Sequence, residues 1–230
     1  MKPLLKISPS VVDSFRTCRF GMYGKTMQDF VSGLSKPWEK TLAQSRGDAY
    51  HKLLEQGPHP FISRDPNTGA PSYAVHEPDM NKTWIFSEKE AAPAIATFEA
   101  HPDKKHEFWG RLNLDFTNYS VYMPLRVDAL QPKVIWDYKT TAKPPKQTNY
   151  AESLAWPFYM MAFPDCTLFR FRVFQLSGGD CIQTDFLFDK DYSREGQAMT
   201  WLTGLVDFIE KNDLEQFFLY QPKKKQDESI

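Results

Sequence analysis

Two short apolar stretches between residues 125 and 141, joined by a Gln-Pro pair, constrain the fold of this chain most strongly. Asp128 lies in the first stretch, and Asp137 and Lys139 lie at the end of the second. Successive side chains of a strand point to opposite faces, so Asp137 and Lys139 share one face while Tyr138 points to the other. A short turn would return the second strand beside Asp128. The pattern therefore predicts two carboxylates and one ammonium group close together on neighbouring strands.

This grouping has a chemical use and a structural alternative. Two carboxylates can hold a hard divalent cation, and an ammonium group beside them can act on the water that the cation binds. Phosphodiester hydrolysis requires these three parts. The alternative is a structural salt bridge between Lys139 and either acid, which would also satisfy a buried carboxylate.

Length and composition favour a single domain over residues 1–230. The chain has 230 residues and 41% hydrophobic content, which is enough to bury a complete core. Residues 58–83 are rich in Pro, Gly, Asn and Asp without sustained periodicity, so we expect a long loop or a small insertion there. The end of the chain, at residues 222–230, is expected to be a flexible tail.

Charge, cysteine content and hydropathy disfavour several classes of protein. The formal net charge of -1 argues against a protein that coats nucleic acid with its whole surface, whereas a local basic groove remains open. The three cysteines are widely spaced without a Cys-x-x-Cys pair, so free thiols are expected rather than disulfides or a zinc site. No apolar run approaches the roughly 20 residues of a membrane span, and the first residues lack a signal-peptide pattern. We therefore expect a cytoplasmic protein without a membrane partner.

Hydrophobic periodicity predicts helices and strands in a mixed order. Helices are expected near residues 8–15, 39–56, 88–100, 150–161 and 201–209, and strands at residues 106–116, 120–130, 134–139, 167–176 and 181–188. Ser10 and Asp13 are expected to cap the first helix. This order is typical of a mixed α/β (α+β) fold, in which a central mixed β-sheet is flanked by helices. The acids would lie on its central strands.

A histidine on the second expected helix extends the pattern. This helix carries Gly47 and His51 in a Gly-x-x-x-His arrangement, ahead of the Asp128 strand and of the Asp-x-Lys strand from Asp137 to Lys139. With these motifs in this order, the chain resembles the PD-(D/E)xK nuclease superfamily, specifically its RecB-like and phage RecE-like exonuclease branches. The opening Ser-Pro-Ser segment and the Cys that follows it also resemble the start of that family.

The resemblance implies a restriction-endonuclease-like core and a role for each site residue. Asp128 and Asp137 would bind Mg2+ or Mn2+ together with the backbone carbonyl of Tyr138 and the imidazole of His51, which favours Mn2+. Lys139 would orient or help deprotonate the attacking water and offset charge on the phosphate. Further residues are assigned near this set: Glu107 and Tyr159 beside the metal ligands, and Arg46, Lys143, Lys146 and Gln147 as contacts to DNA.

Three departures from the family pattern accompany the resemblance. Leu125 stands where the family has a Gly that eases the strand turn, which has little bearing on the chemistry. Ala155 stands where a Gln is expected four residues before Tyr159, so Gln147 or Glu152 would have to substitute for it. Some members bind an iron-sulfur cluster through four cysteines, and with three cysteines no such cluster is expected here.

The sequence therefore predicts a metal-dependent DNA nuclease. The favoured form is an exonuclease that acts on linear or single-stranded ends in phage or bacterial replication or recombination. DNA would be its main partner, and a recombination or replication protein a further one. Two alternatives stay open: an endonuclease of the same fold, and a catalytically silent protein that uses the fold to bind nucleic acid or to serve as a scaffold.

Overall fold

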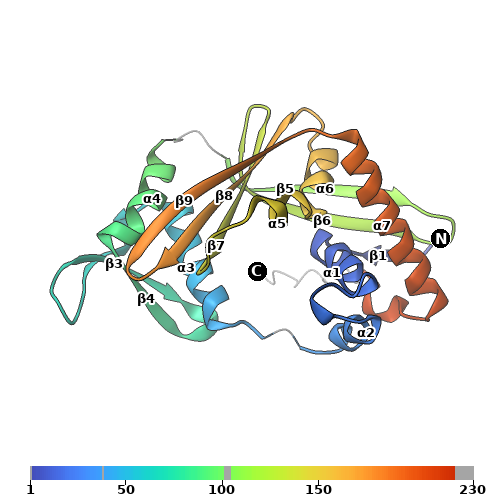
Figure 1. Ribbon diagram of the computed structural model, residues 1–230, viewed down its shortest axis with the longest axis horizontal. Coiled ribbons are helices and arrows are strands. Elements are labelled where there is room, and N and C mark those ends of the chain that lie inside the picture. Colours follow the sequence, from blue (N-terminus) through green and yellow to red (C-terminus); the bar gives the residue numbers. More distant parts are fainter. Residues whose placement is uncertain (1, 38, 101–104, 221–230) are drawn as a thin grey trace, which may run out of the picture.

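The fold is built on a six-stranded sheet with the order β1-β6-β7-β8-β9, in which β5 also pairs with β6 (Figure 1). The computed structural model describes residues 2–37, 39–100 and 105–220, apart from the side chains of residues 105–107. The strands are β1 (Leu4–Lys6), β5 (Lys105–Asp115), β6 (Ser120–Gln131), β7 (Val134–Thr141), β8 (Leu168–Ser177) and β9 (Asp180–Asp189). β1 runs parallel to β6, and β7 runs parallel to β8, whereas the other pairs are antiparallel. The predicted mixed sheet is confirmed.

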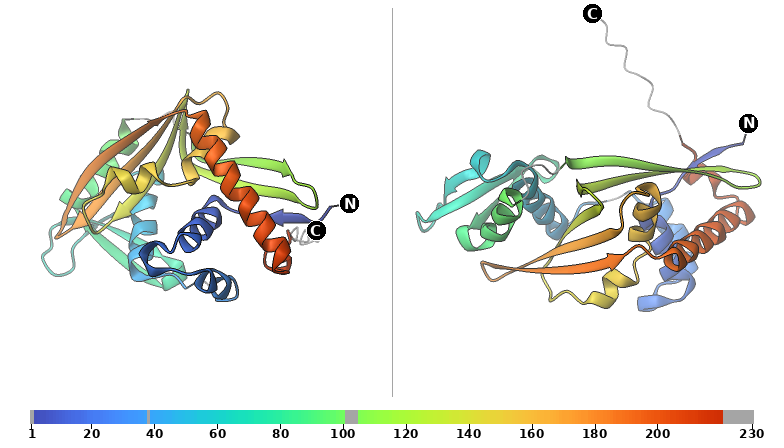
Figure 2. Two further views of the ribbon diagram at one scale, coloured as in Figure 1. Left: turned by 45° about the vertical axis from the view of Figure 1, so that its right-hand side comes forward. Right: turned by 90° about the horizontal axis from the view of Figure 1, so that it is seen from above.

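Helices cover both faces of this sheet, as Figures 1 and 2 show. They are α1 (Pro9–Arg19), α2 (Met27–Leu34), α3 (Leu42–Gln56), α4 (Glu88–Glu99), α5 (Gln147–Ala151), α6 (Ala155–Ala162) and α7 (Tyr192–Lys211). On the face covered by α3 and α4, Tyr50 shares a buried cluster with Tyr138 of β7. On the opposite face, Trp156 of α6 shares another cluster with Ile135 of β7. The expected flanking of the sheet by helices is therefore also confirmed.

Two expectations from composition can be compared with this fold. Within the described ranges, no helix combines the length and the apolar character needed to cross a bilayer. Cys18 and Cys166 are buried, Cys181 is half-buried, and all three are free thiols.

The segment at residues 58–83 is largely ordered into strands, so it is not a long loop, whereas the alternative of a small insertion stays a prediction. It contributes to a separate antiparallel sheet formed by β2 (Ile62–Arg64), β3 (Pro71–Glu77) and β4 (Lys82–Ser87). Val75 of β3 and Phe86 of β4 are buried in the cluster under α3 and α4. The Pro, Gly and Asn residues that suggested a loop lie mainly between these short strands, at residues 65–70 and 78–81.

The start of α1 also differs from the prediction. The helix begins at Pro9, with Ser8 at the N-cap position, so Ser10 lies inside the first turn instead of capping it. Asp13 turns away from the helix start and accepts hydrogen bonds from the hydroxyl of Ser153 (3.0 Å) and from the amide of Leu154 (3.0 and 3.1 Å). Asp13 thereby ties α1 to the segment that opens α6.

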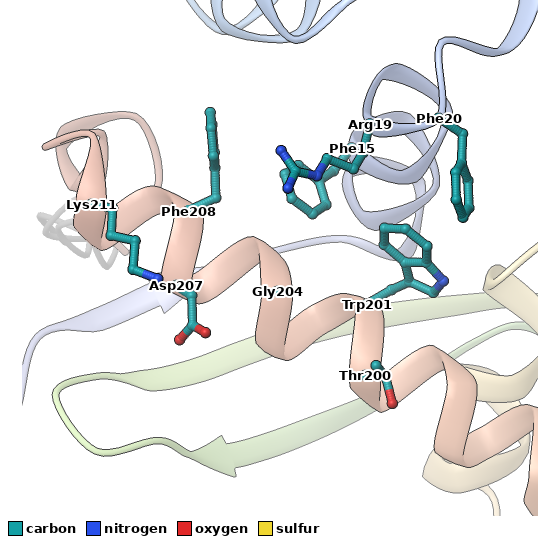
Figure 3. A pocket seen from close by; sticks show the side chains of 9 residues that line it. All are labelled: Phe15, Arg19, Phe20, Thr200, Trp201, Gly204, Asp207, Phe208 and Lys211. Carbon is teal, nitrogen blue, oxygen red and sulfur yellow. The ribbon is translucent and has the colours of Figure 1, made fainter.

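α1 and α7 pack against each other through aromatic side chains. Between ring centroids, Phe15 lies 5.5 Å from Phe208 and 6.2 Å from Trp201, and Phe20 lies 5.0 Å from Trp201. A pocket of about 570 Å³ lies between the two helices and is lined by these rings and by Arg19. Figure 3 shows these side chains from close by. It contains none of the residues predicted to form a site.

The first and last described segments of the chain are hydrogen-bonded to each other. The amide of Lys6 donates to the carbonyl of Phe218 (2.7 Å), and the amide of Tyr220 donates to the carbonyl of Leu4 (2.8 Å). The segment after α7 therefore covers β1 at the edge of the sheet. The predicted flexible tail at residues 222–230 lies outside the described residues.

Candidate active site

β6 and β7 separate close to the turn that joins them, and this leaves a fork in the sheet. Among the described residues, the two strands pair at three positions: 129 with 136, 130 with 135, and 131 with 134. Beyond them β7 continues alongside β8. Asp128, the residue of β6 just before this paired stretch, is buried. Its Oδ2 accepts a hydrogen bond from the backbone N–H of Tyr138 (2.5 Å). The carboxylate of Asp128 therefore bridges the fork.

Asp137 and Lys139 form an ion pair on β7. Asp137 is 6% exposed, whereas the side chain of Lys139 is 48% exposed. Nζ of Lys139 lies 2.6 Å from Oδ2 of Asp137, and apart from this contact the oxygen has no hydrogen-bond donor among the residues that the structure describes. The salt bridge considered as an alternative is thus present, on a carboxylate that retains bonding capacity. Such a buried, incompletely bonded oxygen suits a cation.

Tyr138 faces the opposite layer, as strand alternation predicts. Its ring is fully buried in the cluster under α3, with ring centroids 6.4 Å from Trp136 and 6.3 Å from Phe174. Its side chain therefore holds β7 against the helices, while its backbone amide binds Asp128 at the fork.

α3 adds a histidine and another acid to the site. His51 and Glu55 are four residues apart and therefore lie on the same face of the helix. One potential ligand atom from each of His51, Glu55 and Asp128 lies within 4.8 Å of the other two. An imidazole and two carboxylates at this spacing fit a divalent cation such as Mg2+ or Mn2+. Glu55 was not predicted, although its spacing from His51 was a signal in the sequence.

Gly47 allows α3 to approach the end of β7. A Cβ atom at position 47 would lie 2.5 Å from Oγ1 of Thr140, closer than such atoms can pack. A side chain at this position of the Gly-x-x-x-His pattern would therefore clash with β7, which explains the glycine. It sets the distance between the helix that carries His51 and the strand that carries Asp137.

The environment of the site determines the charges of its side chains. Burial, assisted by the positive charge of Lys139, lowers the pKa of His51 to about 4, so the imidazole is neutral at pH 7 and able to bind a metal. Burial raises the pKa of Asp137, and the ammonium group of Lys139 opposes this effect. Burial lowers the pKa of Lys139, but the carboxylates of Asp137 and Asp128 outweigh it, and the net pKa is raised. A divalent cation would offset the repulsion between the carboxylates.

Tyr159 lies at the margin of the site, and its hydroxyl donates to the carbonyl of Arg126 (3.1 Å). Burial raises the pKa of this hydroxyl. Ala155, one turn earlier on α6, is half-buried and occupies the position of the missing Gln, while Glu152 is exposed. The side chain of Glu107, the other residue predicted near the metal ligands, lies outside the described residues.

The residues predicted to contact DNA fall into two groups. Lys143, Lys146 and Gln147 are exposed in the segment that follows β7 and opens α5. Arg46 instead forms an ion pair with the buried carboxylate of Glu90. This pair joins α3 to α4, so Arg46 has a structural task in addition to the predicted contact with DNA.

Similarity to known proteins is low in sequence but extends over most of the chain. Among solved structures, the chain is similar to the crystal structure of SSO0001, with a TM-score of 0.47 and 10% identity over 88% of this chain and 78% of that one. It is also similar to an alkaline exonuclease, LHK-Exo, from Laribacter hongkongensis, with a TM-score of 0.35 and 15% identity over 92% of this chain and 93% of that one. A comparison with curated proteins gave no match.

The sequence itself matches the family model of the PD-(D/E)XK nuclease superfamily over residues 6–167. The matched range includes the predicted site residues His51, Asp128, Asp137 and Lys139. Nucleases of this superfamily use divalent metal ions, which agrees with the donor atoms found there. The chain therefore belongs to the PD-(D/E)XK nuclease superfamily.

Proposed function

We propose that this protein is a metal-dependent DNA nuclease that acts as an exonuclease on linear or single-stranded ends. The observation that carries the proposal is the fork between β6 and β7. There, ligand atoms of His51, Glu55 and Asp128 lie within 4.8 Å of one another, and the ion pair of Asp137 and Lys139 lies at the same fork. Hydrolysis of a phosphodiester requires a cation, its ligands and a positive group beside them, and the fork offers residues for each part.

The donor atoms at the fork fit Mg2+ or Mn2+. Asp128 and Asp137 would supply carboxylate oxygens, and the backbone carbonyl of Tyr138 a further oxygen. His51 and Glu55 would complete the set from α3, and the imidazole nitrogen shifts the preference toward Mn2+. When bound, the ion would lower the pKa of a water ligand and polarise a phosphoryl oxygen.

Lys139 would stabilise negative charge at the reacting phosphate. Its side chain is half exposed, and its ammonium group is anchored 2.6 Å from Asp137. The neighbouring carboxylates raise its pKa, so the group stays protonated at neutral pH. In this form it can orient the attacking water and stabilise negative charge on the phosphate. The protonated ammonium group is better suited to these two tasks than to removing a proton from the water.

The proposed setting is phage or bacterial replication or recombination, in the cytoplasm. The support is the resemblance of the ordered motifs, from Gly47 to Lys139, to RecB-like and phage RecE-like nucleases. A recombination or replication protein would then be a partner. Co-purification of such a protein with the tagged chain tests this part of the proposal.

Digestion of three substrates tests the activity. An end-labelled linear duplex, its single-stranded form and a closed circle are incubated with Mg2+, Mn2+ or EDTA, with Lys139→Ala as the inactive comparison. Metal-dependent loss of label from linear substrates alone, abolished in Lys139→Ala, is the expected result. Cutting of the circle would show that the protein is an endonuclease and not an exonuclease. Retention of DNA without cleavage of any substrate would identify a silent nuclease fold used for binding.

A further inference from the structure

An exposed tryptophan lies on the outer hairpin of the sheet, next to the fork. Trp109 of β5 is 64% exposed. It pairs directly with Arg126 of β6, so the two side chains project from the same face with their Cβ atoms about 5 Å apart. Arg111, two residues along β5, is exposed on that face as well. The hairpin therefore presents an aromatic ring between two guanidinium groups.

This face leads to the candidate metal ligands. Asp128 follows Arg126 by two residues, with the buried Val127 between them, so Asp128 and Arg126 project from the same face of β6. Two residues span about 6.5 Å along a strand. Arg126 is close enough to His51 for its positive charge to act on that imidazole. Trp109 therefore pairs with Arg126, and Arg126 is the neighbour of Asp128 on the same face of β6.

The opposite face of the hairpin is closed by α6. Phe108 lies 5.8 Å from Phe163 between ring centroids, and a Cβ atom on Gly110 would meet the Phe163 ring at 2.5 Å. The right-hand view of Figure 2 shows α6 and α7 on one side of the hairpin. Because neighbouring residues alternate between faces, Trp109 points away from this packing. Its ring is thus available at the surface instead of filling the core.

We infer that the face carrying Trp109, Arg111 and Arg126 binds a single-stranded part of the DNA substrate and guides it to the fork. This inference rests on the proposed nuclease function and specifies its substrate. An unpaired base can stack on an exposed indole ring, the exposed guanidinium group of Arg111 can bind a phosphate of the same strand, and Arg126 adds positive charge to the face. Bases within a duplex already stack on their neighbours, and a blunt duplex offers the ring only its two terminal pairs. The face therefore selects a single strand over a blunt duplex.

Fluorescence anisotropy tests the inference. It measures, in EDTA, how tightly the protein binds a fluorescein-labelled single-stranded oligonucleotide and a labelled blunt duplex. Trp109→Ala should weaken binding of the single strand about 5- to 150-fold, the range for loss of one stacked base. Trp109→Phe, which keeps an aromatic face, should lose less. Arg111→Ala should reduce the slope of log K against log salt by about 0.7, the contribution of one phosphate contact on a single strand. Tyr192→Ala, which removes a 75% exposed ring at the start of α7, is the matched control and should bind as the parent does.

Two results would overturn the inference. The first is an unchanged affinity of Trp109→Ala for the single strand, with thermal unfolding showing that the variant is folded. The second is an equal loss of affinity for the single strand and the blunt duplex. Because EDTA prevents cleavage, these results do not depend on activity: failure of all substrates to be cut contradicts the proposed function, whereas an unchanged Trp109→Ala contradicts this inference alone.

Discussion

Asp137 is buried beside a lysine and another acid, and its replacement tests the metal site directly. Asp137→Asn preserves the shape of the side chain and removes the charge that would bind a cation. We expect cleavage to fall by about 10³-fold or more, because metal-dependent stabilisation of the transition state is worth several kcal/mol. The thermal unfolding temperature should stay unchanged or rise, because burial and the charge of Asp128 raise the pKa of Asp137, so folding disfavours its ionised carboxylate.

Rates of cleavage and thermal unfolding of the purified variant check this prediction. Asp180→Asn, at the exposed first residue of β9, is the matched control and should keep full activity. Normal cleavage by Asp137→Asn would remove Asp137 from the metal site.

Glu55 provides a second residue-level test, because the sequence motif does not include it. Its carboxylate lies within 4.8 Å of potential ligand atoms of His51 and Asp128. Glu55→Gln should weaken Mn2+ binding about 10- to 100-fold, as removal of groups that bind or support a metal commonly does. Isothermal titration calorimetry with Mn2+ measures this, and Glu99→Gln, an exposed acid at the end of α4, should bind as the parent does. Equal affinity in the Glu55 and Glu99 variants would exclude Glu55 as a ligand.

The difference between Asp137 and Glu55 shows what the sequence could predict at this scale. Strand alternation is a local rule, so it correctly separated Asp137 and Lys139 from Tyr138. The role of Glu55 depends on which face of α3 meets the fork, and the contact between Gly47 and Thr140 helps to set that approach. The spacing of Glu55 from His51 places both on one face of the helix, but no local pattern shows that this face meets the fork.

At the scale of elements, a single side chain joins α1 to the start of α6. Asp13 accepts hydrogen bonds from the Ser153 hydroxyl and the Leu154 amide. Asp13→Ala should lower the free energy of unfolding by about 1.5–3 kcal/mol, the usual contribution of hydrogen bonds to a charged group. Urea unfolding measures the change. Asp13→Asn retains an acceptor oxygen and should lose less; an equal loss in both variants would show that charge matters and hydrogen bonding does not.

Elements differed in how far the sequence could predict them. α3 was expected at residues 39–56 and extends over Leu42–Gln56, because its start and end are marked by Thr41 and Gly57. β2, β3 and β4 were not predicted, because short strands between turn-rich segments leave little periodicity to detect. Their burial comes from packing on α3 and α4, as Val75 and Phe86 show. Tertiary contacts therefore stabilise these strands, and local composition does not reveal them.

At the scale of the whole molecule, the segment after α7 completes the core on the side of β1. Leu214 and Phe218 are 7% and 5% exposed, and the backbone of this segment is hydrogen-bonded to β1. A chain that ends at Asp213 should lose about 3–6 kcal/mol of unfolding free energy, from about 1.5–3 kcal/mol for each buried side chain.

Urea unfolding compares this shortened chain with one that ends at Tyr220. The longer of the two keeps the contacts of Leu214 and Phe218 and should match the parent in stability. If both shortened chains unfold at the same urea concentration, the segment does not contribute to the core in this way.

The pairing of β1 also has a consequence for the order in which the protein can assemble. Leu5 lies beside Val121 of β6 and forms a bridge with Leu219. During synthesis, β1 therefore emerges from the ribosome long before either partner exists, and Leu5 and Ile7, both fully buried in the finished fold, stay exposed in the meantime. The nascent chain can complete this edge of the sheet only after residue 219 has emerged, so translation itself delays the finished enzyme.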